Sequence, residues 1–208
     1  MHLLFTILLG FGLSFLGQLP LGTMSITATQ ISVQENFGNA WKYTVGVSLI
    51  EMAYLRLVLS GVQWIMQHKL FFSILNWITL VFFLGLGVWS FISAQKQDAG
   101  KKALLLNNRI NRFMLGVSMS ALNPAQIPFW FIWSGYFLDS GWLSSGSVSF
   151  NWFTLGCGLG TVAGLALYMY GGNFLVTKMH TSNKTLNKIM GVVFIIAAIA
   201  QFYRLMKP

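Results

Sequence analysis

Glu51 is the residue of this chain whose position most clearly calls for a chemical role. It is the only acidic residue inside a long apolar run, from about Trp41 to Met66, and it follows Tyr43 by eight residues. A membrane-spanning helix rises 1.5 Å per residue, so Glu51 would lie about 12 Å deep. A carboxyl group at that depth is costly and is expected to face the interior of a helix bundle. There it could bind a substrate ammonium group, carry a coupling proton or pair with a base.

Arg56 follows Glu51 by five residues in the same run. Five residues turn a helix by about 140°, so the two side chains point to different faces and are not expected to pair with each other. Each is expected to meet another helix or water. We take both as candidates for proton coupling, and a purely structural ion pair is the alternative for Arg56.

Two prolines, Pro20 and Pro124, each interrupt an apolar run. Proline lacks the backbone N–H and clashes with the preceding turn, so each is expected to break its helix. The half-helix that starts after a break presents free N–H groups and a partial positive charge, which suit a carboxylate. Structural kinks without a ligand are the alternative interpretation.

Polar and small residues gather around both expected breaks. Their amides, hydroxyls and backbone could bind a polar solute, or could satisfy the backbone groups that the breaks set free. As candidates for substrate binding we take Gln18, Pro20, Gly22, Thr23, Asn123, Pro124 and Gln126.

The composition of the whole chain is that of an integral membrane protein. Of its 208 residues, 55% are hydrophobic and 8% are charged, against about 25% charged residues in a soluble domain. So few charges exclude a soluble enzyme, a disordered chain and a nucleic-acid-binding domain. A spanning helix needs about 20 mainly apolar residues. Six such runs occur, and we expect an all-α integral membrane protein with six spans at about 3–29, 41–66, 70–94, 113–138, 150–176 and 189–205.

The lysines and arginines indicate how these spans are oriented. With six spans, the gap before the second run, the gap at 95–112 and the gap at 177–188 lie on one side. That side holds nine Lys and Arg residues when Lys42, at the start of the second run, is included. Basic residues accumulate on the cytoplasmic side of a membrane. We therefore expect the loop at about 95–112 in the cytoplasm and both termini outside.

The chain also repeats itself. Gly12, Ser14 and Pro20 recur 104 residues later as Gly116, Ser118 and Pro124. In the second and fifth runs, residues 43–46 (Tyr-Thr-Val-Gly) match residues 153–156 (Phe-Thr-Leu-Gly), and Ala53 matches Ala163. Chance similarity between apolar segments is the alternative.

A true repeat would give two halves of three helices, at about 1–94 and 113–208. Three is an odd number, so the second half would enter the membrane from the opposite side. The sequence therefore predicts one transmembrane domain over residues 1–208, built as a 3+3 inverted repeat with Pro-broken first and fourth helices, an architecture of many secondary transporters.

Few residues are available for other chemistry. The single cysteine, Cys157, cannot form a disulfide within the chain, and the three histidines are scattered. No catalytic residue, metal site, cofactor or nucleic-acid partner is expected. An intramembrane enzyme would need a nucleophile and a base at one depth. A cation or metal exporter would need more carboxylates. These two, and a pore of related fold, are the alternatives to a secondary exporter.

Three segments carry a resemblance to a known family. They are residues 12–29 (GLSFLGQLPLGTMSITAT), residues 113–130 (FMLGVSMSALNPAQIPFW) and residues 46–51 (GVSLIE). The chain resembles the LysE/RhtB family of bacterial amino-acid exporters. That family typically shows Pro-Gly-Pro, Asn-Pro-Lys and Gly-x-x-x-Gly-Asp at these places. This chain departs from it with Leu21-Gly22 after Pro20, Ala125 in place of the lysine, and Ile50-Glu51.

The resemblance covers nearly the whole chain and implies a function. It implies a multi-pass protein of the bacterial inner membrane that exports an amino acid or a similar small polar solute, driven by a proton gradient. Its partners would be the lipid bilayer, the solute and a proton or other coupling ion. The departures from the motifs leave open which solute is moved and whether the lost lysine matters, and the sequence leaves open whether the chain forms a homo-oligomer.

Overall fold

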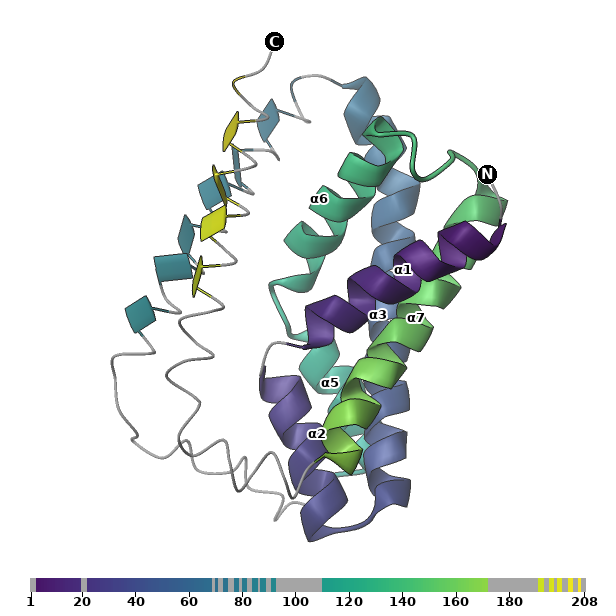
Figure 1. Cartoon of the computed structure of the whole chain (residues 1–208), viewed down its shortest axis with the longest axis vertical. Coiled ribbons are helices and arrows are strands. Elements are labelled where there is room, and N and C mark those ends of the chain that lie inside the picture. Colours follow the sequence, from purple (N-terminus) through teal and green to yellow (C-terminus); the bar gives the residue numbers. More distant parts are fainter. Residues whose placement is uncertain are drawn as a thin grey trace. The chain divides into compact units, whose positions relative to one another are not determined.

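The computed structural model describes residues 3–19, 22–68 and 110–171, together with scattered positions between 70 and 92 and between 191 and 206. The described residues form helices and contain no strand. The helices, shown in Figure 1, are α1 Leu3–Gln18, α2 Thr23–Gln34, α3 Phe37–Gln67, α5 Arg112–Ala121, α6 Gln126–Asp139 and α7 Ser147–Tyr170. The chain divides into two compact units, Met1–Ser60 with Lys102–Thr177 and Gly61–Lys101 with Lys178–Pro208.

The expected all-helical membrane class is confirmed for the described residues. Two helices, α3 and α7, contain stretches long and apolar enough to cross a membrane, namely Phe37–Val62 and Ser147–Tyr170. The pair α1 and α2 passes the same test as one span bent by 79°. The third and sixth expected spans, at about 70–94 and 189–205, lie largely outside the described residues.

The helix boundaries differ from the apolar runs for local reasons. The second run was expected from Trp41, but α3 begins at Phe37 because the side chain of Asn36 accepts a hydrogen bond from the backbone N–H of Asn39, at 2.8 Å. Such a cap satisfies one of the free N–H groups of a first helical turn. Hydropathy finds the apolar length of a helix and misses a polar first turn of this kind.

The first and fourth expected spans are each found as two helices. Pro20 lies outside the described residues, between α1 and α2. Pro124 lies exposed in the connection between α5 and α6. In that connection the side chain of Asn123 accepts a hydrogen bond from the backbone N–H of Ala125, at 3.1 Å.

Glycines bring the helices of the first unit into backbone contact. A Cβ atom on Gly156 of α7 would overlap the carbonyl oxygen of Ile7 in α1, and one on Gly10 would overlap that of Phe153. Between α3 and α5, Gly46 and Gly116 make the same kind of contact. Small residues at such crossings allow the close approach that membrane helices use to pack.

Two apolar clusters of the first unit leave a polar layer between them. The Tyr43 cluster consists of Met24, Ala28, Ile31, Ala40, Tyr43, Val47, Leu165 and Met169. The Phe153 cluster consists of Leu55, Leu59, Trp130, Phe137, Leu143, Phe150, Phe153 and Cys157. On α3 the buried acid between the two clusters is Glu51, and on α7 the hydroxyl that faces it is that of Thr161. The fold therefore encloses these two polar side chains between two layers of apolar ones.

The glycine contacts give a prediction for stability. Gly156→Ala should lower the stability of the protein by roughly 1–3 kcal/mol, because its new methyl group forces the backbones of α1 and α7 apart. Gly12→Ala in α1 is the matched control, because a Cβ there meets nothing within 4 Å, so this variant should gain up to about 1 kcal/mol of helix propensity. Thermal unfolding of the detergent-solubilised protein measures both. Equal effects of the two substitutions would contradict the close packing.

Candidate functional site

Glu51 is buried and is held by side chains from three other helices. Gln18 of α1 donates from Nε2 to Oε1 at 2.9 Å, and Gln126 of α6 donates to the same oxygen at 3.4 Å. Thr161 of α7 donates from Oγ1 to Oε2 at 2.5 Å. Only 6% of the surface of Glu51 is exposed. These three residues, all uncharged, and Glu51 itself are called the Glu51 centre below.

Two serines extend the hydrogen bonds of the Glu51 centre. Ser14 of α1 shares a 2.7 Å hydrogen bond with Thr161. Ser120 of α5 accepts a 2.7 Å hydrogen bond from Gln126 and donates to the carbonyl oxygen of Val47 at 3.3 Å. The centre therefore joins α1, α3, α5, α6 and α7 through buried polar contacts, each of which costs free energy if it is left unmade.

Part of the expected substrate-binding set lies in this centre. Gln18 and Gln126, two of the candidates for substrate binding, both donate to the carboxyl group of Glu51. The side-chain oxygen of Gln126 is buried and makes no hydrogen bond in the part of the chain described. That oxygen is an acceptor directly beside the carboxyl group of Glu51.

The other candidates make contacts elsewhere. Gly22 and Thr23 are exposed at the start of α2, and the carbonyl oxygen of Thr23 accepts a hydrogen bond from Thr27 at 2.8 Å. Asn123 caps Ala125 within the α5–α6 connection, where Pro124 is also found. Pro20 lies outside the described residues. A shared solute site built from both expected breaks therefore stays a prediction.

Arg56 points away from Glu51, as the helical geometry predicted. Its guanidinium group donates to Asn151 of α7 at 3.1 Å and to Ser60 at 2.9 Å, and it lies 5.8 Å from the ring centre of Phe150. Arg56 thus has polar partners and an aromatic ring at a different level of α3. Its proposed part in proton coupling stays untested.

Sequence reasoning missed Thr161, Ser14 and Ser120. The signal for Thr161 was present in the expected internal repeat. The match of residues 43–46 with 153–156 continues at the same spacing to Glu51, whose counterpart is Thr161. A single hydroxyl in an apolar helix attracts no attention by composition, and only its contact with Glu51 gives it meaning. Among the residues that the structure describes, no group of three or more His, Cys, Asp and Glu side chains could hold a metal ion.

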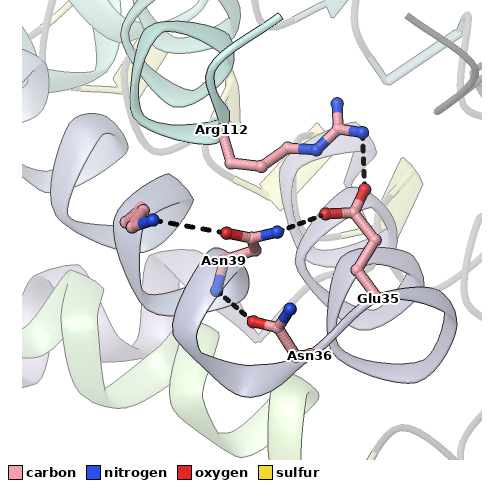
Figure 2. Close-up of polar contacts among 5 residues, drawn as sticks. Glu35, Asn36, Asn39 and Arg112 are labelled. Atoms are coloured by element: carbon pink, nitrogen blue, oxygen red, sulfur yellow. Dashed lines mark hydrogen bonds and ion pairs between the residues drawn. The ribbon is translucent and has the colours of Figure 1, made fainter. Parts of the chain in front are cut away.

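A second polar cluster joins the α2–α3 turn to the start of α5. Figure 2 shows Arg112 bonded to Glu35 at 2.5 Å, with Asn39 donating to the other carboxylate oxygen at 2.8 Å. Lys42 donates to the side chain of Asn39 at 3.5 Å. Burial by itself would raise the pKa of Glu35, but the hydrogen bonds from Arg112 and Asn39 and the charge of Arg112 together hold that pKa below its ordinary value of 4.5.

The lowered pKa of Glu35 predicts an acid-dependent loss of stability. A carboxyl group with a depressed pKa stabilises the fold above its ordinary value, and this contribution is lost as the pH falls through the depressed value. Glu35→Gln should lower the melting temperature at neutral pH. The difference from wild type should shrink as the pH falls below 4.5 and vanish below the depressed pKa of the folded state, where Glu35 is protonated in both states.

Thermal unfolding at a series of pH values measures this effect. Arg56→Gln serves as the control, because Arg56 bonds to Asn151 and Ser60 rather than to a carboxylate in these contacts. A melting difference for Glu35→Gln that stays constant down to acidic pH would contradict the ion pair's role.

Comparison with known proteins identifies the family. No curated protein and no solved structure matches the chain. The profile of the family described as LysE type translocator matches residues 15–204 and so includes every helix described above except the first twelve residues of α1. The chain therefore belongs to the LysE type translocator family, whose members are membrane transporters of amino acids or similar solutes.

Proposed function

We propose that the protein is a secondary transporter that exports an amino acid or a similar small polar solute across the bacterial inner membrane, coupled to protons through Glu51. The observation that carries the proposal is the Glu51 centre. A carboxyl group lies buried in a spanning helix and is bonded by uncharged side chains from α1, α6 and α7. Ionisable residues in membrane spans are rare and mark ion or proton pathways.

The nature of the partners supports a proton as the coupling ion. Two amides and one hydroxyl surround the carboxyl group, and all three donate to it. These donors accommodate the ionised form, while the hydroxyl can also accept from the protonated form. A basic partner would instead hold Glu51 permanently ionised. None of these partners is a cation. Protonation of Glu51 therefore leaves no positive charge among them without a partner.

The packing supports the proposed inverted repeat. Gly10 contacts the carbonyl of Phe153, and Gly116 contacts the carbonyl of Tyr43 in the same way. Gly116 of α5 follows Gly10 of α1 by 106 residues, and Phe153 of α7 follows Tyr43 of α3 by 110. The two contacts are therefore related by a shift of 106 residues between α1 and α5 and of 110 residues between α3 and α7. The contacts of Gly156 with Ile7 and of Gly46 with Phe113 are related by the same two shifts.

Burial supports the shift of 106 residues along whole helices. The buried residues of α5, Gly116 and Ser120, correspond at a shift of 106 to Gly10 and Ser14, which are buried in α1. Buried residues of α2 and α6 correspond likewise, for example Ile31 with Phe137. The motif comparison paired the residues of α1 and α5 at a separation of 104. The contacts and the burial instead favour a separation of 106, which is two residues longer.

Under this repeat the two apolar clusters are counterparts. Tyr43 and Val47 of the Tyr43 cluster correspond to Phe153 and Cys157 of the Phe153 cluster, and Leu165 corresponds to Leu55. Glu51 and Thr161 are counterparts that bond to each other between the clusters. A transporter with inverted repeats opens one side of its site at a time by exchanging the conformations of its halves. We propose that the two clusters are the two gates.

The orientation follows the charges of the sequence. The Glu35–Arg112 pair lies at the same end of α3 as Lys42, on the side that the basic residues place in the cytoplasm. We propose that this pair holds the Tyr43 side closed toward the cytoplasm. The counterparts of Glu35 and Arg112 in the proposed repeat are Gly141 and Thr6, which carry no charge.

The test is export from proteoliposomes. Purified protein is reconstituted with each member of an amino-acid panel inside, and efflux is measured with and without a pH gradient. At least one solute should leave faster when the gradient is imposed. Efflux of none of them, or efflux that ignores the gradient, would contradict the proposal, and movement of divalent cations in the same vesicles would favour a cation exporter.

Glu51→Gln should reduce gradient-driven efflux to the rate of protein-free vesicles, because the amide cannot carry a proton. The variant keeps most of the volume and hydrogen-bonding capacity of the side chain, so it should fold and insert. Asp139→Asn makes the corresponding acid-to-amide change at the last residue of α6 and should keep gradient-driven efflux. Full activity of Glu51→Gln would leave Glu51 with a structural role alone.

A further inference from the structure

The hydroxyl group of Thr161 links Glu51 to two further polar groups. Its hydroxyl oxygen lies 2.5 Å from Oε2 of Glu51, 2.7 Å from the hydroxyl of Ser14 and 3.1 Å from the carbonyl oxygen of Cys157. A hydroxyl group has one hydrogen to donate and can accept two. Thr161 can therefore donate to only one of these oxygens at a time.

The protonation state of Glu51 determines which oxygen accepts the hydrogen of Thr161. When Glu51 is ionised it can only accept, so the hydrogen of Thr161 points to Oε2, and Ser14 donates to Thr161. When Glu51 is protonated on Oε2, its own hydrogen points to Thr161. The hydrogen of Thr161 then turns to Ser14 or to the carbonyl of Cys157. The distances permit both arrangements without any movement of heavy atoms.

This reversal reaches the contact between α1 and α7. Ser14 and Gln18 lie four residues apart, on one face of α1, and both take part in the hydrogen bonds of the centre. The same face of α1 packs on Gly160 and Gly164 of α7, whose added Cβ atoms would lie 3.0 Å from the Ser14 side chain and 2.6 Å from that of Gln18. A change in the hydrogen bonds of Thr161 therefore exchanges donor and acceptor between Ser14 of α1 and Thr161 of α7 inside a tight helix contact.

We propose that Thr161 is a positioning residue that transmits the protonation state of Glu51 to the α1–α7 contact by reversing the direction of its hydrogen bonds. The proposal rests on the proposed function, since it assigns a mechanism to Glu51 as the coupling group. It adds a residue that proton coupling by itself does not require. Thr161 transfers no proton out of the centre and acts through Glu51 and Ser14.

Among the residues that the structure describes, few other groups titrate near Glu51. Tyr43 on α3 and Cys157 on α7 are the titratable side chains that interact electrostatically with it. The described helices α1 and α2 contain no titratable residue. On α5 and α6 the charged residues are Arg112 and Asp139, which lie at the helix ends remote from Ser120 and Gln126. Among the described residues, Glu51 is therefore the carboxyl group that bonds directly to Thr161, and its titration is identified by comparison with Glu51→Gln.

Thr161→Val is the central variant, because valine has the shape of threonine without the hydroxyl. It removes a donor to ionised Glu51, so the midpoint at which Glu51 becomes protonated should move to higher pH by about one unit, the shift that loss of one charge-assisted hydrogen bond produces. Thr161→Ser restores the hydroxyl and should restore the midpoint. Thr154→Val is the matched control, because Thr154 is buried on the same helix and its hydroxyl has no hydrogen-bond partner in the described part.

Two measurements follow the midpoint. Infrared difference spectra of the purified protein during pH titration report the carbonyl band of the protonated carboxyl group, which is assigned to Glu51 by its absence in Glu51→Gln. The pH dependence of solute efflux from proteoliposomes reports the same event during transport. We expect both midpoints to move together in Thr161→Val and to stay at the wild-type value in Thr154→Val.

The infrared titration needs no substrate, so it separates this inference from the proposed function. A shifted Glu51 band in a protein that moves no solute would support Thr161 as the partner of Glu51 and contradict the transport proposal. If Thr161→Val does not fold, Ser14→Ala takes its place and should shift the midpoint in the same direction by less. An unshifted band in the folded variant that is tested would overturn the role of Thr161.

Discussion

The structure depends on one constraint, namely that a carboxyl group buried among membrane-spanning helices must be hydrogen-bonded by its neighbours. Glu51 satisfies this constraint with Gln18, Gln126 and Thr161, which come from three different helices. In a medium that holds little water, leaving such a group without hydrogen-bond partners would cost a free energy of several kcal/mol. The constraint therefore fixes how α1, α6 and α7 meet α3, and it explains why amides and hydroxyls occur at these few positions of otherwise apolar helices.

The glycines make this arrangement geometrically possible. Hydrogen bonds to Glu51 require the axes of α1 and α7 to approach closely, and Gly10, Gly156 and Gly160 remove the side chains that would prevent it. The Tyr43 and Phe153 clusters then close the space on either side of the centre. Close packing on glycine and closure by large side chains are thus complementary: the first brings the polar groups together, and the second keeps water away from them in this state.

Much of the fold could be predicted from the sequence, and the reasons are simple. Low charge and long apolar runs indicated membrane helices, and the depth of Glu51 within its run indicated a buried carboxyl group. Gln18 and Gln126 attracted attention as candidates for substrate binding because both flank an expected break, and the structure places both against Glu51. Thr161 was missed because hydropathy and spacing do not show which hydroxyl of an apolar helix faces an acid 110 residues away. The substrate-binding roles expected for Asn123 and Thr23 stay predictions. A polar side chain beside a helix end often bonds to the backbone itself, as the side chain of Asn123 does to the N–H of Ala125.

The central claim is that Glu51 couples solute movement to proton movement. The most direct measurement records protons while solute flows: proteoliposomes with a pH-sensitive dye inside are loaded with the transported amino acid and diluted into solute-free buffer without an imposed pH gradient. If the two fluxes are coupled through Glu51, outward flow of solute drives protons inward and acidifies the interior in the wild-type protein, and the signal disappears in Glu51→Gln. Solute efflux with no change of internal pH in the wild-type protein, or an unchanged proton signal in Glu51→Gln, would contradict the account.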